Sequence, residues 1–192
     1  ILCDMHRVRG DQGSCEVKDP GQGQPSSRKN ALGLPLRSAT YLAVGHSNMS
    51  LIDRFNSFAA AFEACVIDDK WERLGEHFAE NATYLNVGSP DAKINGRWEI
   101  VDYLRNDVSN NDRRFDSRKL HPISDPTTSG NSLSRRWRCT YTLAGVPDLV
   151  VEGEARYEFE DDLIYSLEEE ITSESMERYV EWMEKFGSRL RA

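Results

Sequence analysis

The second half of the chain alternates apolar and polar residues over three long segments. These segments are residues 132–143, 149–160 and 163–171, and short turn-like sequences such as AGVPD and EDD separate them. A period of two places successive side chains on opposite faces of a strand, so each segment is predicted to have one face on a core. Short connections between such strands favour antiparallel hairpins. The pattern therefore predicts a largely antiparallel sheet for this half of the chain.

One charged residue interrupts the apolar face of the last two segments. In LVVEGEARYEF and LIYSLEEEI the odd-numbered positions on one side are Leu149, Val151, Ala155, Tyr157, Phe159, Leu163, Tyr165, Leu167 and Ile171. Glu169 falls on the same side. Moving a carboxylate out of water costs several kcal/mol unless it is paired or protonated. We therefore predict that Glu169 has either a functional role or a buried partner.

The region before these strands is predicted to be mainly helical. Ser50 and Asp53 form a helix-start signature, and apolar residues follow at helical spacing through Val66. The elements expected elsewhere are a shorter helix with Trp71, Leu74 and Phe78, a strand at 82–87, a loop at 88–96, a helix at 98–108, a strand at 115–123, a turn at 127–131 and a final helix capped near Thr172 or Ser173. These elements indicate an α+β domain.

Composition argues against several classes of partner. The net charge of -8 opposes nonspecific attraction to nucleic acid and to anionic lipid. No apolar run approaches the roughly 20 residues of a membrane span, and the first residues lack the apolar stretch of a secretory signal. We therefore expect a cytoplasmic protein. The four cysteines and four histidines have no metal-type spacing, and neither a metal nor another cofactor is indicated.

The first quarter of the chain differs from the remainder. Residues 10–30 are rich in Gly, Ser, Gln and Pro and have no hydrophobic period, which is typical of disorder. We expect residues 1–48 to be a disordered leader or a non-native extension. Residues 49–192 are expected to form a single domain.

The order helix, helix, strand, helix and antiparallel meander resembles the nuclear transport factor 2-like superfamily over residues 50–172. The stretch WERLGEHFAENATYLNVGSP is similar to the corresponding part of SnoaL-like polyketide cyclases, ketosteroid isomerases and limonene epoxide hydrolases. The resemblance implies a curved antiparallel sheet and three N-terminal helices that form a cone around an apolar pocket, with an added C-terminal helix. It also implies a homodimer.

The resemblance does not carry the catalytic residues of the isomerases. It places their tyrosine donor at Phe62, their base at Asn86 and their aspartate donor at Ala155. The chemistry needs a base and two acidic donors, so ketosteroid isomerase activity is rejected.

The epoxide hydrolase pattern is matched only in part. Its Tyr-x-Asn pair resembles Tyr84 and Asn86, and its final aspartate falls on Glu169, but no carboxylate lies at the needed position near Arg135. SnoaL-type cyclases use one acidic residue in an apolar cavity, which matches Glu169. Alternation alone would send Tyr84 and Asn86 to solvent, whereas the resemblance turns them inward.

Two hypotheses follow for the function. In the first, the protein is a cofactor-free enzyme that binds a small apolar, cyclic or polyketide-like molecule, and Glu169 is its general acid or base. The residues expected to bind the molecule are Tyr84, Asn86, Trp137, Tyr141, Tyr157, Phe62 and Arg135. In the second, the protein is a noncatalytic ligand-binding or dimerisation module, and Glu169 forms a structural ion pair with Arg135.

Overall fold

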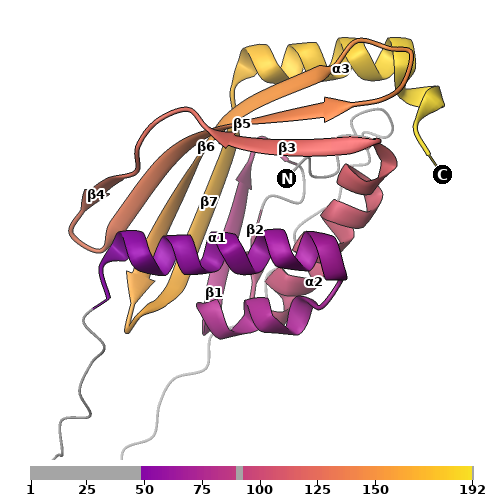
Figure 1. Cartoon of the computed structure of the whole chain (residues 1–192). Helices are drawn as coiled ribbons and strands as arrows, with labels where there is room; N and C mark the ends of the chain where they lie inside the picture. The colour runs from indigo at the N-terminus through magenta and orange to yellow at the C-terminus, as the bar shows by residue number, and fades with distance from the viewer. Residues whose placement is uncertain (1–48, 90–92, 192) are drawn as a thin grey trace, which may run out of the picture. The chain divides into compact units, whose positions relative to one another are not determined.

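The structure is a computed structural model that describes residues 49–89 and 93–191. Helices lie against a seven-stranded sheet in an α+β arrangement (Figure 1). Residues 1–48, for which a leader was expected, and residues 90–92 of the expected loop lie outside the described residues. In the part that is described, no helix combines the length and the apolar character needed to cross a bilayer.

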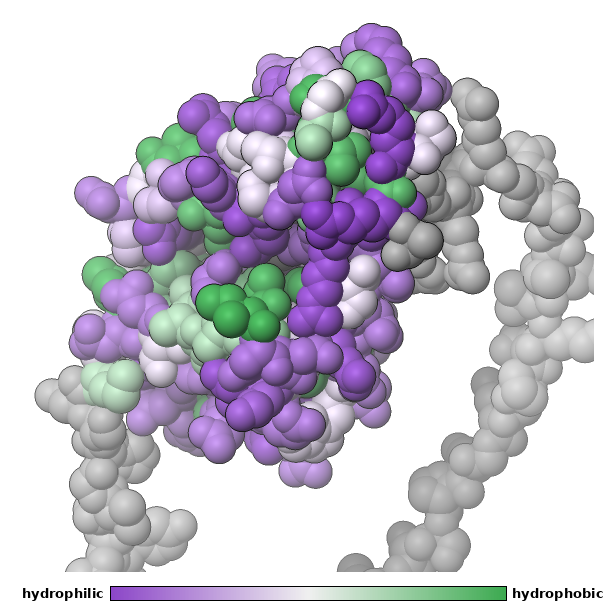
Figure 2. Space-filling view, turned by 45° about the vertical axis from the view of Figure 1, so that its right-hand side comes forward, coloured by the Kyte–Doolittle hydropathy of each residue, from purple (hydrophilic) through white to green (hydrophobic). Residues whose placement is uncertain are grey.

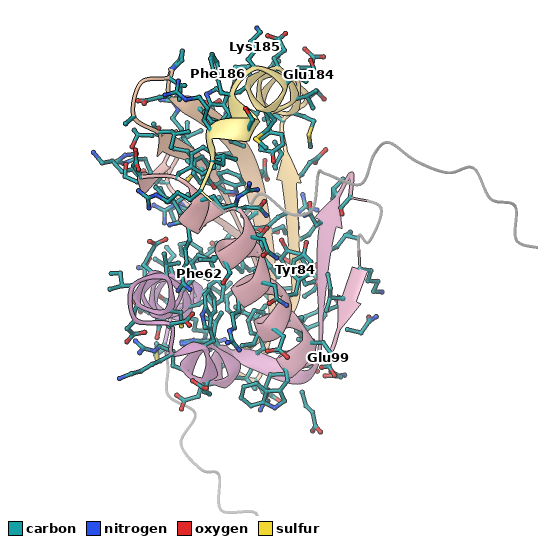
Figure 3. The ribbon with its side chains drawn as sticks, turned by 90° about the vertical axis from the view of Figure 1, so that its right-hand side faces the viewer. Phe62, Tyr84, Glu99, Glu184, Lys185 and Phe186 are labelled. Carbon is teal, nitrogen blue, oxygen red and sulfur yellow. The ribbon has the colours of Figure 1, made fainter. Side chains whose placement is uncertain are left out.

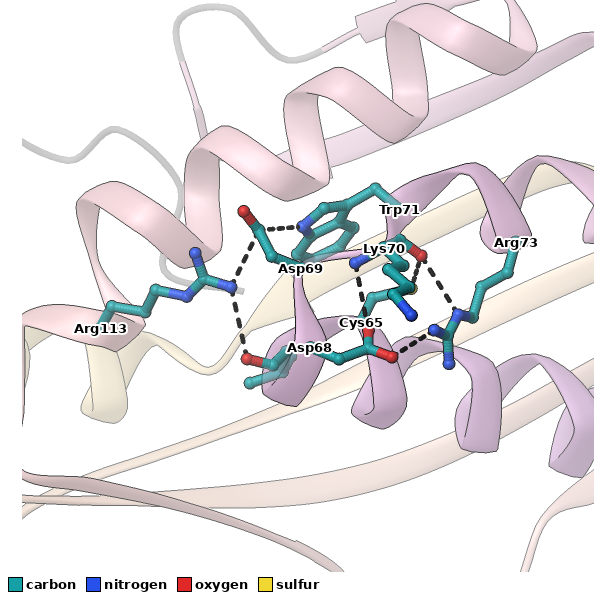
Figure 4. Close-up of polar contacts among 8 residues, drawn as sticks. Cys65, Asp68, Asp69, Lys70, Trp71, Arg73 and Arg113 are labelled. Atoms are coloured by element: carbon teal, nitrogen blue, oxygen red, sulfur yellow. Dashed lines mark hydrogen bonds and ion pairs between the residues drawn. The ribbon is translucent and has the colours of Figure 1, made fainter.

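The first helix, α1 (Leu51–Asp68), begins at the predicted capping box. The Asp53 amide donates to Ser50 Oγ at 3.2 Å, and the Ser50 amide donates to the Asp53 carboxylate at 3.3 Å. Asp69 caps the C-terminus of α1, and its carboxylate accepts hydrogen bonds from Trp71 Nε1 at 2.7 Å and Arg113 at 2.9 Å (Figure 4). These bonds connect the end of α1 with the two helical segments that pack beside it.

Three of the other five helical elements follow the prediction with small differences, whereas two short 3-10 segments, at 112–114 and 187–189, were not predicted. The five elements are η2 (Trp71–His77), α2 (Arg97–Asn110), η3 (Asp112–Arg114), α3 (Ser173–Phe186) and η4 (Gly187–Arg189). The segment predicted as a short helix is the 3-10 helix η2, and Phe78 already belongs to the following strand. Thr172 caps α3 as predicted, because its side chain accepts a hydrogen bond from the Ser175 amide.

The sheet has the strand order β2-β1-β7-β6-β5-β3, and β4 also pairs with β5. The strands are β1 (Phe78–Val87), β2 (Lys93–Asn95), β3 (Ser117–Pro122), β4 (Thr127–Ser129), β5 (Ser132–Thr142), β6 (Leu149–Glu160) and β7 (Leu163–Ile171). The pairs formed by β5, β6 and β7 are antiparallel, as their short connections predicted. β1 runs parallel to β7, so the sheet is mixed.

Two short strands occupy segments that were expected to be irregular. β2 lies in the expected loop and pairs with β1, and β4 lies in the expected turn and pairs with β5. Each has only three residues, which is too short for a recognisable hydrophobic period. Their pairing is decided by the neighbouring strand rather than by their own sequence.

The start of β7 corrects the predicted alternation. Leu163 and Tyr165 were expected to face the core, but Ile164 is buried and Tyr165 is exposed. A β-bulge explains the difference, because Ile164 pairs with Phe159 and Ser166 pairs with Glu158, which leaves Tyr165 without a partner in the ladder. After the bulge Leu167 and Glu169 face inward, as predicted.

α1 crosses the inner face of the sheet, and α3 lies beside β6 (Figure 1). The largest cluster of buried side chains fills the space between the helices and the sheet. Phe62 of α1 and Tyr84 of β1 both point into this interior (Figure 3). Packing therefore brings the middle of α1 close to the inner faces of the central strands.

The inner face of β6 depends on a glycine where β5 packs against it. A Cβ atom at Gly153 would lie 2.5 Å from Trp137 Cζ2 and 2.5 Å from the Glu170 carbonyl oxygen. We predict that Gly153→Ala lowers the free energy of unfolding by about 1–3 kcal/mol, because the Trp137 ring and the Glu170 backbone must both move. Urea denaturation measures this change.

Gly75→Ala is the matched control for this prediction. A Cβ at Gly75 would meet the far edge of the Trp98 ring at 2.6 Å, but that residue is 53% exposed and its ring can move. The control should stay within about 0.5 kcal/mol of the wild type. Equal losses in the two variants would show that the close contacts at Gly153 are not the cause.

Candidate functional site

A cavity of about 300 Å³ lies between α1 and the inner face of the sheet. Most of its lining is aromatic or aliphatic, and a few side chains that can carry charge complete it. The lining residues are Phe55, Phe58, Ala59, Phe62, Glu63, Leu104, Leu120, His121, Pro122, Arg135, Trp137, Ala155, Tyr157, Leu167 and Glu169. A largely apolar cavity with a few convergent polar groups is the usual form of a small-molecule site.

Glu169 lies on the cavity side of β7 and is only 4% exposed. Its Oε2 accepts a hydrogen bond of 2.7 Å from the Tyr84 hydroxyl. Burial raises the pKa of the Glu169 carboxyl, and the hydrogen bond from Tyr84 opposes part of that rise. The carboxyl is therefore held in a fixed position and has an increased tendency to keep a proton.

The strand register places Glu169 in a row that crosses four strands. Glu169 pairs with Asn86 of β1 on one side and with Ala155 of β6 on the other, and Ala155 pairs in turn with Arg135 of β5. Neighbouring strands lie about 4.8 Å apart, so the backbone positions of Glu169 and Arg135 are roughly 10 Å apart along the row. The small side chain of Ala155 lies between them.

Arg135 does not neutralise Glu169. In the described residues no ion pair joins the two side chains, and the Arg135 guanidinium lies 5.2 Å from the centre of the Phe55 ring. The Glu169–Arg135 pair of the second hypothesis is therefore not formed. The reason is the strand order, which inserts β6 between the two strands that carry these residues.

Comparisons with known proteins identify the fold. An NTF2-like protein from Anabaena variabilis is 12% identical, with a TM-score of 0.55 over 68% of this chain and 96% of that one. An NTF2-like protein of unknown function from Burkholderia pseudomallei is 14% identical, with a TM-score of 0.51 over 68% and 97%. The chain has the nuclear transport factor 2-like fold.

Another comparison agrees with this fold. TerC, co-crystallised with polyporic acid, is 11% identical, with a TM-score of 0.50 over 67% of this chain and 98% of TerC. No protein-family model and no curated protein matches the sequence. A function for this chain therefore has to be inferred from the site itself.

Tyr84 and Asn86 face inward, as the resemblance to the NTF2-like superfamily predicted. Both are buried, although Leu85 and Val87, at the alternate positions of the strand, are more apolar. Tyr84 bonds Glu169, and the Asn86 amide donates to the Tyr103 hydroxyl at 3.4 Å. Neither is among the residues that line the cavity. They lie on β1, the strand next to Glu169, and the hydrogen bond from Tyr84 orients the carboxyl.

Tyr141 lies away from the cavity, contrary to the expected grouping. It is buried on the inner face of β5, as alternation predicted, but its hydroxyl donates to Asp112 Oδ1 at 2.8 Å. The other residues expected to bind the molecule or to act on it do line the cavity: Phe62, Arg135, Trp137, Tyr157 and Glu169. Their catalytic or binding roles stay predictions.

Sequence reasoning did not identify the charged cluster beside the cavity. Arg118 of β3 forms an ion pair with Asp112 at 2.7 Å and donates to both carboxylate oxygens of Glu63 at 3.0 Å. Arg118 also lies over the Phe62 ring. The strand that contains Arg118 has a weak alternation, so no pattern indicated that this arginine is buried. The cluster leaves Glu63 with a cationic partner.

No metal centre is formed by the residues that the structure describes, since no three His, Cys, Asp or Glu side chains gather there as ligands would. Hydrophobic residues reach the surface in the middle of one face, with hydrophilic residues around them (Figure 2). The chemical groups that line the cavity are a buried carboxyl, a guanidinium and several aromatic rings, together with Glu63 and His121.

The raised pKa of Glu169 predicts a defined pH dependence of stability. Because the folded pKa is above the ordinary value of 4.5, the folded state holds more protons than the unfolded state between these two pKa values. The stabilising contribution is complete below the unfolded pKa and is lost as the pH rises through the folded pKa, with a slope of at most about 1.4 kcal/mol per pH unit. Glu169→Gln removes this dependence, so it should gain stability relative to the wild type as the pH rises above 4.5.

Urea denaturation of both proteins between about pH 4 and pH 8 measures this difference. Glu170→Gln, which changes the exposed neighbour in β7, is the control and should follow the wild type. A constant difference between Glu169→Gln and the wild type over the whole range would contradict a raised pKa.

Proposed function

We propose that this protein binds a small apolar cyclic molecule in the cavity and that Glu169 acts on it as a general acid or base. The observation that carries the proposal is the buried carboxyl of Glu169 at the wall of an aromatic cavity, with Tyr84 as its hydrogen-bond donor. Perturbed carboxyls inside cavities are enriched at functional sites. A purely structural carboxylate would be expected to have a cationic partner.

The environment of Glu169 suits proton transfer. Burial raises the pKa of its carboxyl above the ordinary range, which brings proton release closer to neutral pH. Tyr84 holds Oε2, so Oε1 is the oxygen available to a molecule in the cavity. A carboxyl fixed on a strand can keep the geometry that acid–base catalysis requires.

The cavity walls favour a flat, apolar molecule. Phe55, Phe58 and Tyr157 line the cavity, and the Phe55 and Phe58 rings pack edge to face on Tyr157, with ring centres 5.1 Å and 5.7 Å from it. Aromatic walls bind rings by burial of apolar area and by stacking. TerC, which shares the fold and was co-crystallised with polyporic acid, supports the idea that this fold accommodates a small organic acid.

The residues around Glu169 separate this chemistry from that of the isomerases. The two strand neighbours of Glu169 are Asn86 and Ala155, the positions at which the resemblance places the isomerase base and its aspartate donor. Neither residue is ionisable. The single carboxyl of this row is in the strand between them, which supports one-residue acid–base chemistry as in SnoaL-like cyclases.

Binding can be tested with a neutral aromatic probe. We predict that 2-naphthamide binds the wild-type chain saturably and that Ala59→Trp removes the binding, because Ala59 of α1 lines the cavity. Ala60→Trp places the same side chain on the exposed face of α1 and should bind like the wild type. Isothermal titration calorimetry measures both. Equal binding by the two variants would place the probe outside the cavity.

Acid–base chemistry can be tested with an activated cyclic ketone. General acid–base catalysis contributes roughly 10²–10⁴-fold, so the wild type should accelerate exchange of the acidic C1 protons of 2-tetralone in D₂O. Glu169→Gln should lose most of this acceleration and still bind 2-naphthamide. Proton NMR follows the exchange, with Glu170→Gln as the control. Equal exchange rates with native and with heat-denatured wild-type protein would favour a noncatalytic binding module.

A further inference from the structure

Two hydrogen-bond donors of the cavity have no acceptor. In the described part of the protein, Arg135 Nε and Trp137 Nε1 are buried and make no hydrogen bond, although both side chains line the cavity. Buried donors are nearly always paired, and an unpaired one costs stability. Two such donors on one cavity wall are available to an acceptor on a bound molecule.

The donors are adjacent on the same face of one strand. Arg135 and Trp137 are two residues apart on β5, so their side chains point to the same side. On the neighbouring strand β6, Arg135 pairs with Ala155 and Trp137 pairs with Gly153, and these are the two smallest residue types. The Trp137 ring lies directly over Gly153. Nothing bulky at these two positions of β6 therefore separates the donors from the cavity.

The charges of the cavity are arranged asymmetrically. Glu63 is paired with Arg118. Glu169 lies two strands away from Arg135 and accepts a hydrogen bond from Tyr84. Arg135 is half-buried, lies over the Phe55 ring and forms no ion pair in the described residues. The Tyr157 hydroxyl lies in the field of both Glu169 and Arg135: burial raises its pKa most, Glu169 raises that pKa further, and Arg135 lowers it.

We propose that Arg135 and Trp137 form a subsite for the carboxylate of an aromatic or alicyclic acid. The carboxylate accepts hydrogen bonds from Arg135 Nε and Trp137 Nε1, the ring lies over Ala155, and the far edge of the ring reaches Glu169. The backbone positions at the two ends of the row are roughly 10 Å apart, which leaves room for one or two fused rings between them. This inference rests on the proposed function, and it defines the class of molecule and its direction in the cavity.

A matched pair of probes separates charge from shape. 2-Naphthoate and 2-naphthamide have the same ring system, and only the first is anionic at neutral pH. We expect the wild-type chain to bind 2-naphthoate about tenfold or more tightly than 2-naphthamide, as charge-assisted hydrogen bonds provide. Arg135→Met should abolish this preference, and Trp137→Phe, which keeps a ring, should weaken 2-naphthoate several-fold.

Arg136→Met is the control, since it removes the same charge from the exposed face of the same strand. It should keep the preference. Calorimetric titrations are accompanied by urea denaturation, and if Arg135→Met does not fold, Trp137→Phe and Arg135→Lys provide the test, with Arg135→Lys expected to keep only part of the preference.

The outcomes separate this inference from the proposed function. Equal affinities of the two probes for the wild type, or equal losses in Arg135→Met and Arg136→Met, would overturn the carboxylate subsite and leave ligand binding intact. Failure of both probes to bind the wild type would overturn both proposals.

Discussion

The burial of one carboxyl in an otherwise apolar interior is the constraint on which the site depends. Glu169 faces aromatic and aliphatic residues rather than water, and the hydroxyl of Tyr84 is its hydrogen-bond donor. Because desolvation favours the neutral form, the fold raises the pKa of this group while the hydrogen bond fixes its position. A carboxyl in this state is costly for stability and suited to proton transfer.

The register of the sheet explains why Glu169 and Arg135 stay apart. The row Asn86, Glu169, Ala155 and Arg135 places one strand between the acid and the arginine. Ala155 is small, so this strand leaves open space between the two charged groups. The same arrangement that prevents an ion pair between them thus forms a cavity with an acid at one end and donors at the other.

Much of the fold could be predicted from the sequence, because it depends on local patterns. Alternation located β5, β6 and the inward position of Glu169, and the Ser50 capping box located the start of α1. The bulge at Tyr165 and the contact of Tyr141 with Asp112 could not be predicted, because both depend on how distant segments pair. Alternation in β1 was misleading for Tyr84 and Asn86, and only the resemblance to NTF2-like proteins turned them inward. The separation of Glu169 from Arg135 required the strand order.

The central claim is that the row from Glu169 to Arg135 is the floor of a ligand site. A crystal structure of the full chain with 2-naphthoate tests it most directly. We expect the probe to lie over Ala155, with its carboxylate within hydrogen-bonding distance of Arg135 Nε and Trp137 Nε1 and its far ring edge beside Glu169. A structure in which protein side chains fill the cavity and the probe binds elsewhere would contradict this claim. An ion pair between Arg135 and Glu169 would also contradict it.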